Sequence, residues 1–168
     1  MELKGSDGEI ARVRLSDGSS FLVHGEILAR EGLAVGDSLD EPRICTLKIN
    51  SEHVFAKRSA LALLARAAHT RKGLSAKLKK RGFGPEAIRS ALARMIELGY
   101  LDDGAFADNW TRSRIASRRE GWKALYRGLL SRGVPRKIAE SVSRISAPMR
   151  LKLKTRAFSR LGCRRTPR

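Results

Sequence analysis

The chain has 168 residues, and its adjacent carboxylates Asp102 and Asp103 are the most obvious candidates for acid–base chemistry. General acid and base catalysis needs two groups that face one substrate. Neighbouring residues better fit the start of a helix, where the Asp102 side chain accepts an amide hydrogen bond and Asp103 adds negative charge. Leu101 and Phe106 occupy the paired positions of a hydrophobic staple. The expected structural motif comprises Gly99, Tyr100, Leu101, Asp102, Asp103, Phe106 and Trp110.

The other reactive side chains of the sequence are scattered. The three histidines fall in different segments without ligand-spaced partners, and Cys45 and Cys163 belong to no CxxC pair. Metal and disulfide frameworks need such spacings. Walker, nucleophile-elbow and dinucleotide motifs do not occur in the sequence either. We therefore expect a protein that is not an enzyme and has no metal and no cofactor. With no apolar run of membrane or signal type, we expect a soluble, cytoplasmic chain.

Basic side chains are the largest group that could bind a ligand, since 35 Lys and Arg stand against 17 Asp and Glu. Residues 1–50 hold six basic and nine acidic side chains, whereas residues 51–168 hold 29 basic and eight acidic ones. Singly, each basic residue is explained by a solvated helix face, but together they favour DNA binding. The candidate DNA-binding and partner-binding residues are Lys77, Lys79, Lys80, Arg81, Arg112, Arg114, Arg118, Arg119, Lys123, Arg127, Arg132, Arg136 and Lys137.

Aromatic residues near these basic positions could serve as platforms for bases. Tyr100, Phe106 and Trp110 have helical spacing beside the staple, which favours packing in a core. Trp122 is different, because three basic residues flank it in the sequence. Its interpretation stays open between packing and stacking on a base or a partner side chain.

The elements that would position these residues change in type along the chain. Apolar residues on both sides of Asp17 and Gly18 predict a β-hairpin, since glycine tolerates the positive φ of a tight turn. A turn-rich stretch follows over 32–37, and residues 44–49 are expected to form a last short strand. A hairpin alone is marginally stable, so this region should lean on its neighbour.

After residue 51 the apolar spacing changes to three or four residues, which predicts helices. The first covers about 52–70, the second about 74–81, and a third begins at Pro85, which suits the first helical position. The expected buried faces comprise Val54, Leu61, Leu64 and Ala68 in the first, Leu74 and Leu78 in the second, and Ile88, Leu92, Met95 and Ile96 in the third.

Three further helices repeat this order, from the Asp102 cap to about residue 117, over about 122–131, and from Pro135. Leu74 and Leu78 map onto Leu125 and Leu129 at an offset of 51 residues. Each unit is then three helices, long, short and long. A seventh helix after residue 148 would open a third unit.

The sequence thus predicts a mainly α protein, with tandem three-helix repeats in an elongated curved body and a small N-terminal β-hairpin region. The expected parts are a β region over 1–50, repeats over 51–101 and 102–146, and a truncated third repeat with a basic tail over 147–168.

The repeat and the junction after it resemble the RecX family of recombinase regulators. The pattern is Leu-x3-Leu-x2-Arg-Gly-Phe over 74–83, Ile88-x3-Leu92, then Gly-Tyr-Leu-Asp-Asp over 99–103 with Phe-Ala and Trp downstream. The resemblance covers roughly residues 55–145. The chain departs from the family at residues 73–75, where a serine cap and acidic residues are usual, and in its short third unit.

This resemblance implies a monomeric regulator that binds a RecA recombinase filament on single-stranded DNA, without sequence preference. It would inhibit ATP hydrolysis, strand exchange and filament extension, and so regulate DNA repair, recombination and the SOS response. The alternatives are a sequence-independent nucleic-acid binder and a helix-turn-helix transcription factor. Against the latter, no candidate recognition helix is rich in the Asn, Gln and Arg that read bases.

Overall fold

Residues 2–6, 10–118 and 120–144 are described by a computed structural model of the chain. They fall into two compact units. The sheet unit comprises Met1–Ala67 and Leu74–Tyr100, and the helical unit comprises Ala68–Gly73 and Leu101–Arg168. Helix α3 (Arg71–Lys80) therefore contributes its first residues to the helical unit and the remainder to the sheet unit.

The sheet unit begins with three antiparallel strands in the order β1 (Glu2–Ser6), β2 (Ile10–Arg14) and β3 (Ser20–His24). Gly18 has a φ of 85° in the turn between β2 and β3. The Asp17 carboxylate accepts a hydrogen bond from the Ser19 amide at 2.8 Å. The hairpin expected here is confirmed, and β1 adds a third strand to it.

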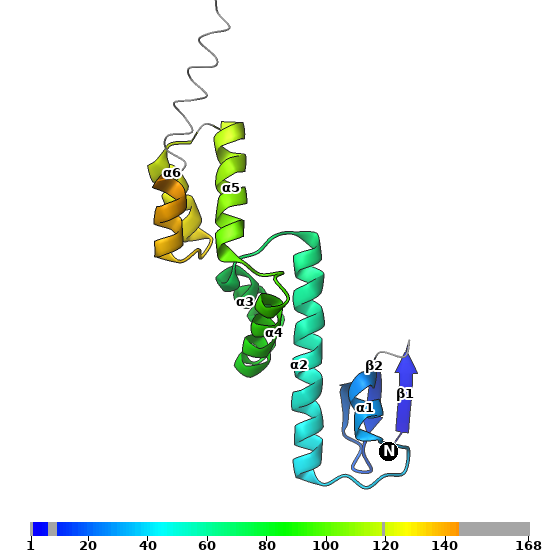
Figure 1. Cartoon of the computed structure of the whole chain (residues 1–168). Helices are drawn as coiled ribbons and strands as arrows, with labels where there is room; N and C mark the ends of the chain where they lie inside the picture. The colour runs from blue at the N-terminus through cyan, green and yellow to red at the C-terminus, as the bar shows by residue number, and fades with distance from the viewer. Residues whose placement is uncertain (1, 7–9, 119, 145–168) are drawn as a thin grey trace, which may run out of the picture. The chain divides into compact units, whose positions relative to one another are not determined.

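Helices α1 (Gly25–Glu31) and α2 (Glu41–Arg66) pack on one face of this sheet. Val13 and Val23 project from β2 and β3 into a core that includes Ile27 of α1 and Leu47 of α2. Figure 1 shows the sheet and α1 beside the N-terminal half of α2. The β region is thus stabilised by a helix that the sequence analysis assigned to the following repeat.

The strand expected over 44–49 is wrong, because this segment lies inside α2. Asp40 caps the helix by accepting a hydrogen bond from the Arg43 amide at 3.2 Å, and a proline occupies its first turn. Ile44 and Leu47 are buried three residues apart while the residues between them are exposed, which is helical spacing. The division expected at residue 50 therefore falls within a continuous helix.

Helix α4 (Pro85–Glu97) packs along α2 in the sheet unit. The Glu52 carboxylate accepts a hydrogen bond from the Gly84 amide at 2.6 Å, which holds the α4 N-terminus against α2. Small residues allow the two helices to approach closely. The buried alanines are Ala56 and Ala60 on α2 and Ala87 and Ala91 on α4.

The expected buried faces are partly wrong. Leu61, Ala68 and Ile96 are exposed, whereas Leu63 on α2 and Met95 on α4 are buried. The predicted core packing of Tyr100 is also wrong, since its side chain is 59% exposed after α4 ends. The second helix also begins earlier than expected, at Arg71.

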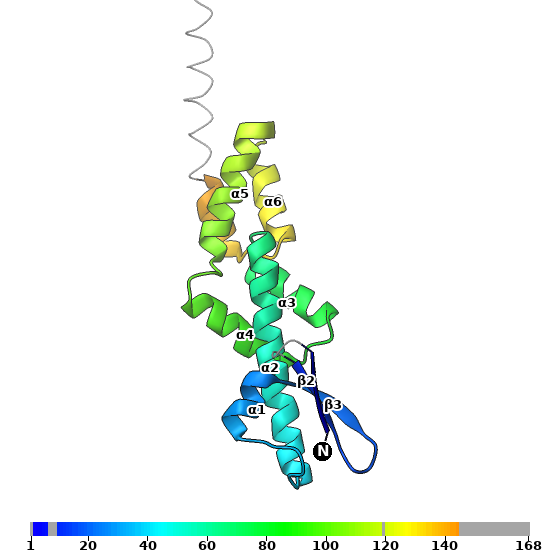
Figure 2. The ribbon, with the colours of Figure 1, turned by 90° about the vertical axis from the view of Figure 1, so that its right-hand side faces the viewer.

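The helical unit is built from α5 (Asp103–Arg118), α6 (Trp122–Ser131) and a helix over 136–144. Its core comprises Ala107, Leu129, Val134, Ala139 and Val142. Phe106 and Trp110 pack against this core, as their helical spacing predicted. Figure 2 shows α5 and α6 lying side by side within this unit.

Apart from α1, the described helices form two tandem three-helix repeats, α2–α3–α4 and α5–α6–136–144. The expected long, short and long pattern holds in the first repeat, where α2, α3 and α4 have 26, 10 and 13 residues. The mainly α fold with a small N-terminal β region is confirmed. The expected seventh helix after residue 148 lies outside the described residues, and the elongated shape stays a prediction. Among the described residues, no helix has the length and apolarity needed to cross a bilayer.

Candidate nucleic-acid and partner interface

The two adjacent carboxylates hold helix N-termini. The Asp102 Oδ1 atom accepts hydrogen bonds from the Gly104 and Ala105 amides at 2.7 and 3.2 Å, which is an N-cap of α5. The Asp103 side chain is only 2% exposed. It accepts a hydrogen bond from the Arg71 amide at 2.8 Å and lies 3.6 Å from the Arg71 guanidinium. Each carboxylate therefore stabilises a different helix start, as anions do there.

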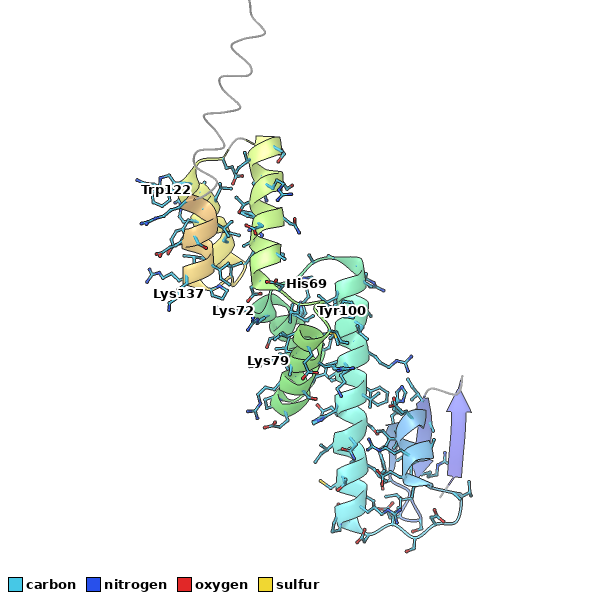
Figure 3. All side chains as sticks on the ribbon, in the orientation of Figure 1. His69, Lys72, Lys79, Tyr100, Trp122 and Lys137 are labelled. Atoms are coloured by element: carbon cyan, nitrogen blue, oxygen red, sulfur yellow. The ribbon has the colours of Figure 1, made fainter. Side chains whose placement is uncertain are left out.

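Four candidate basic residues lie together at the C-terminal end of α3, and we call them the α3 basic surface. This surface comprises Lys77, Lys79, Lys80 and Arg81, all exposed. The Arg81 guanidinium donates a hydrogen bond to the Ser59 hydroxyl of α2. Figure 3 shows Lys79 on the side of the sheet unit away from α2. Helix α3 contains no acidic residue, so its own sequence supplies no charge to neutralise this surface.

Two other candidates, Arg114 and Arg132, are engaged by Trp110 in the helical unit. Their guanidinium carbons lie 5.2 and 4.7 Å from the centroid of the Trp110 ring. Arg114 also lies 3.4 Å from the Glu120 carboxylate, and Arg132 donates to the Gly128 carbonyl at 3.0 Å. Cation–π contacts of this kind contribute about 0.5–2 kcal/mol. These two arginines therefore have structural roles in packing α5 and α6.

A second exposed basic group extends over α6 and the start of the next helix, and we call it the α6 basic surface. It comprises Lys123, Arg127, Arg136 and Lys137, together with Trp122. The Arg136 guanidinium donates to the Tyr126 hydroxyl at 3.1 Å, which raises the pKa of Arg136. This hydrogen bond connects α6 to helix 136–144, so residues from both helices belong to one surface.

Three further candidates lie apart from these surfaces or outside the described side chains. Arg112 is exposed on α5 one turn after the exposed Asp108, an arrangement that reduces its local positive charge. Arg118 ends α5, but its side chain lies outside the described residues, as does the whole of Arg119. The structure therefore assigns the thirteen candidates to two basic surfaces, a tryptophan contact and these three positions.

The sequence analysis missed the residues that build the start of α3. The Thr70 hydroxyl accepts a hydrogen bond from the Gly73 amide at 3.0 Å and donates to the Arg132 carbonyl at 2.6 Å. A Cβ atom at Gly133, whose φ is 81°, would lie 2.6 Å from the Lys72 Cβ. A threonine just before a helical segment is the sequence pattern that could have indicated the Thr70 cap. The contact of Thr70 with Arg132, at the C-terminus of α6, joins distant parts of the sequence, so no local pattern indicated it.

The described residues contain no group of three or more His, Cys, Asp or Glu side chains that could hold a metal ion. The geometry is therefore that of two exposed basic surfaces on helical repeats. Such surfaces suit a polyanionic partner.

Comparison with known families matches both repeats separately. The family model for the RecX first three-helix domain matches residues 56–95, and that for the second three-helix domain matches residues 102–142. The chain belongs to the RecX family. The first RecX domain contains the α3 basic surface and the second contains the α6 basic surface.

Curated relatives agree with this assignment. The RecX protein of Chlorobaculum tepidum is 44% identical over 81 residues, which are 48% of this chain and 51% of the relative. A RecX protein of Thermus thermophilus is 45% identical over 83 residues, or 49% of this chain and 56% of the relative. The RecX protein of Clostridium botulinum is 24% identical over 140 residues, which are 83% of this chain and 65% of the relative. The matches thus span about half to two thirds of these relatives.

Solved structures share the fold. A crystal structure of a regulatory protein RecX superposes with a TM-score of 0.66 at 22% identity, covering 83% of this chain and 70% of that one. The crystal structure of RecX from Lactobacillus salivarius gives a TM-score of 0.55 at 22% identity, and the match covers 57% of this chain and 62% of that one.

The two RecX domains of this chain differ in charge. Residues 56–95 contain eleven basic and one acidic side chain, whereas residues 102–142 contain nine basic and five acidic ones. Two of those five acids are the buried Asp103 and the Arg114 partner Glu120. The first domain therefore carries most of the excess positive charge in the matched region.

Proposed function

We propose that this RecX-family chain binds a RecA recombinase filament on single-stranded DNA and inhibits its ATPase, strand-exchange and filament-extension activities. The presence of both RecX three-helix domains in one chain is the observation that supports this function most. We place the protein in the cytoplasm as a monomeric, non-catalytic regulator of recombination and DNA repair. Its curated relatives carry the name regulatory protein.

The charge of the two domains supports the DNA part of this proposal. A recombinase filament on DNA presents phosphates, and basic side chains that approach phosphates release bound counterions. The lysines of the α3 basic surface and the cations of the α6 basic surface are exposed, as this contact requires. We therefore expect the affinity of the chain for the filament to fall steeply as the salt concentration rises.

The test is ATP hydrolysis by the cognate recombinase on single-stranded DNA, measured while the chain is titrated in. The DNA is present at a saturating concentration and then in large excess over the recombinase. The proposal predicts inhibition that persists in both conditions, since the chain acts on the filament. Inhibition that disappears with excess DNA would mean that the chain only competes for DNA, as a sequence-independent nucleic-acid binder does.

A further inference from the structure

Trp122 is exposed in a way that the other tryptophan of the chain is not. It occupies the first position of α6, and 50% of its surface is exposed. Trp110, in contrast, packs against the core of the helical unit between two guanidinium groups. An indole side chain of this size has a large apolar area, and leaving half of it in water forgoes burial energy. This exposure gives Trp122 a ring face that a ligand could cover.

Two cations lie near Trp122 on the same helix. The Lys123 ammonium lies 5.9 Å from the centroid of the Trp122 ring. Arg127 is one turn further along α6, and its guanidinium donates to the Lys123 carbonyl at 3.4 Å, which draws this second cation back toward the first turn. The exposed indole therefore belongs to a charged surface.

The next helix extends the same surface. Arg136 is bonded to Tyr126 of α6, and Lys137 follows it with an exposed side chain. Figure 3 shows Trp122 and Lys137 on the side of these helices that is turned away from α5. Glu140 is an acid that interacts with Arg136, so four cations stand against this one carboxylate.

We propose that Trp122 stacks on a base of single-stranded DNA while Lys123, Arg127, Arg136 and Lys137 contact the flanking phosphates. This inference rests on the proposed function and deepens it, because it names the side chain that contacts a base. A base in a single strand exposes its ring face, whereas duplex bases already stack on one another. Four exposed cations favour a polyanion, and a single strand offers phosphates and exposed base faces together.

Stacking can be separated from phosphate binding with two probes of equal charge. These are an oligo(dT) strand of about 20 nucleotides and an abasic strand of the same length, and the fluorescence anisotropy of each is measured with the full chain. Stacking on an aromatic residue is worth about 1–3 kcal/mol per base, so oligo(dT) should bind about 5- to 160-fold more tightly than the abasic strand. In Trp122→Ala the two strands should bind equally, with the affinity for the abasic strand unchanged. Trp122→Phe should restore most of the preference.

Tyr100→Ala provides the matched control, since Tyr100 is another exposed aromatic residue and lies outside the α6 basic surface. It should retain the preference for oligo(dT). Equal affinity of the unmodified chain for the two strands would overturn the proposal. So would equal losses in Trp122→Ala and Tyr100→Ala, because the effect would then not depend on the α6 basic surface.

Intrinsic fluorescence gives a second readout on the same samples. Binding of oligo(dT) should quench the emission of the unmodified chain, whereas Trp122→Phe, which retains Trp110, should show little quenching. The recombinase ATPase is measured in parallel. If the chain inhibits ATP hydrolysis but shows no oligo(dT) preference, stacking fails and the proposed function stands. If it binds oligo(dT) preferentially without inhibiting, the proposed function fails.

Discussion

Replacing Gly128 by alanine should destabilise the helical unit, although alanine favours a helix. A Cβ atom at Gly128 would lie 2.4 Å from Cη2 of Trp110, and 3.1 and 3.3 Å from two other atoms of that ring. The Trp110 ring has little freedom to retreat, because it packs against the core and contacts Arg114 and Arg132. Overpacking lowers the free energy of unfolding by about 1–3 kcal/mol. The higher helix propensity of alanine relative to glycine offsets about 1 kcal/mol of this loss. We expect a net loss of up to about 2 kcal/mol.

The measurement is urea unfolding of the full chain, followed by circular dichroism. The control repeats Gly128→Ala in a Trp110→Leu background, where the smaller side chain removes the clash. There the glycine replacement should be neutral or stabilising, which gives a coupling energy between the two sites. If Gly128→Ala lowers stability equally in both backgrounds, or raises it in the unmodified chain, the packing of α5 against α6 described above is incorrect.

Three further perturbations test other contacts. Asp103→Ala should lower the unfolding free energy by about 1–3 kcal/mol, measured by urea unfolding, because the Arg71 amide loses the buried carboxylate that accepts its hydrogen bond. Asp17→Asn should lower the melting temperature at neutral pH. Hydrogen bonds from Ser19 lower the pKa of Asp17, so the carboxylate stabilises the fold above its unfolded pKa of 3.8. Thermal scans should show that the difference in melting temperature between the two chains vanishes as the pH falls through the folded pKa. Lys79→Ala with Lys80→Ala should reduce the salt dependence of single-strand binding, with the slope of log affinity against log salt falling by about 0.7 per lost phosphate contact, as salt titrations would show.

The parts of the fold that sequence patterns predicted are those governed by local signals. Asp102 capped α5 as its position indicated, and α6 covered Trp122–Ser131 as the spacing of Leu125 and Leu129 required. The Asp17–Gly18 turn formed because it needs only a side-chain acceptor and a residue that tolerates positive φ. These features depend on residues within one turn of each other, and the sequence shows them directly.

The errors arose where contacts between distant segments decide the structure. Residues 44–49 alternate enough to suggest a strand, but the long helix that contains them is held by packing against the sheet and α4. Ala60 on α2 and Ala91 on α4 are fully buried, and small residues give a weak apolar signal. Tyr100 illustrates the same limit, since its position after the end of α4 does not show whether another segment covers its side chain, which is exposed.

The candidate site could be predicted by charge but not by role. Composition identified an excess of cations, and the internal repeat of apolar residues identified two three-helix units. Only the structure shows that Arg114 and Arg132 contact the Trp110 ring, which packs against the core of the helical unit. Lys123 and Arg127 have no such contact with Trp110 among the described interactions, and they remain candidates for binding.

We expect the chain to recognise the recombinase filament and not DNA alone. The most direct measurement is co-sedimentation with recombinase filaments preformed on single-stranded DNA with a non-hydrolysable ATP analogue, challenged with increasing amounts of bare single-stranded DNA. The chain should stay in the filament pellet when bare DNA is in large excess. Transfer of the chain to the bare DNA in proportion to its amount would contradict it.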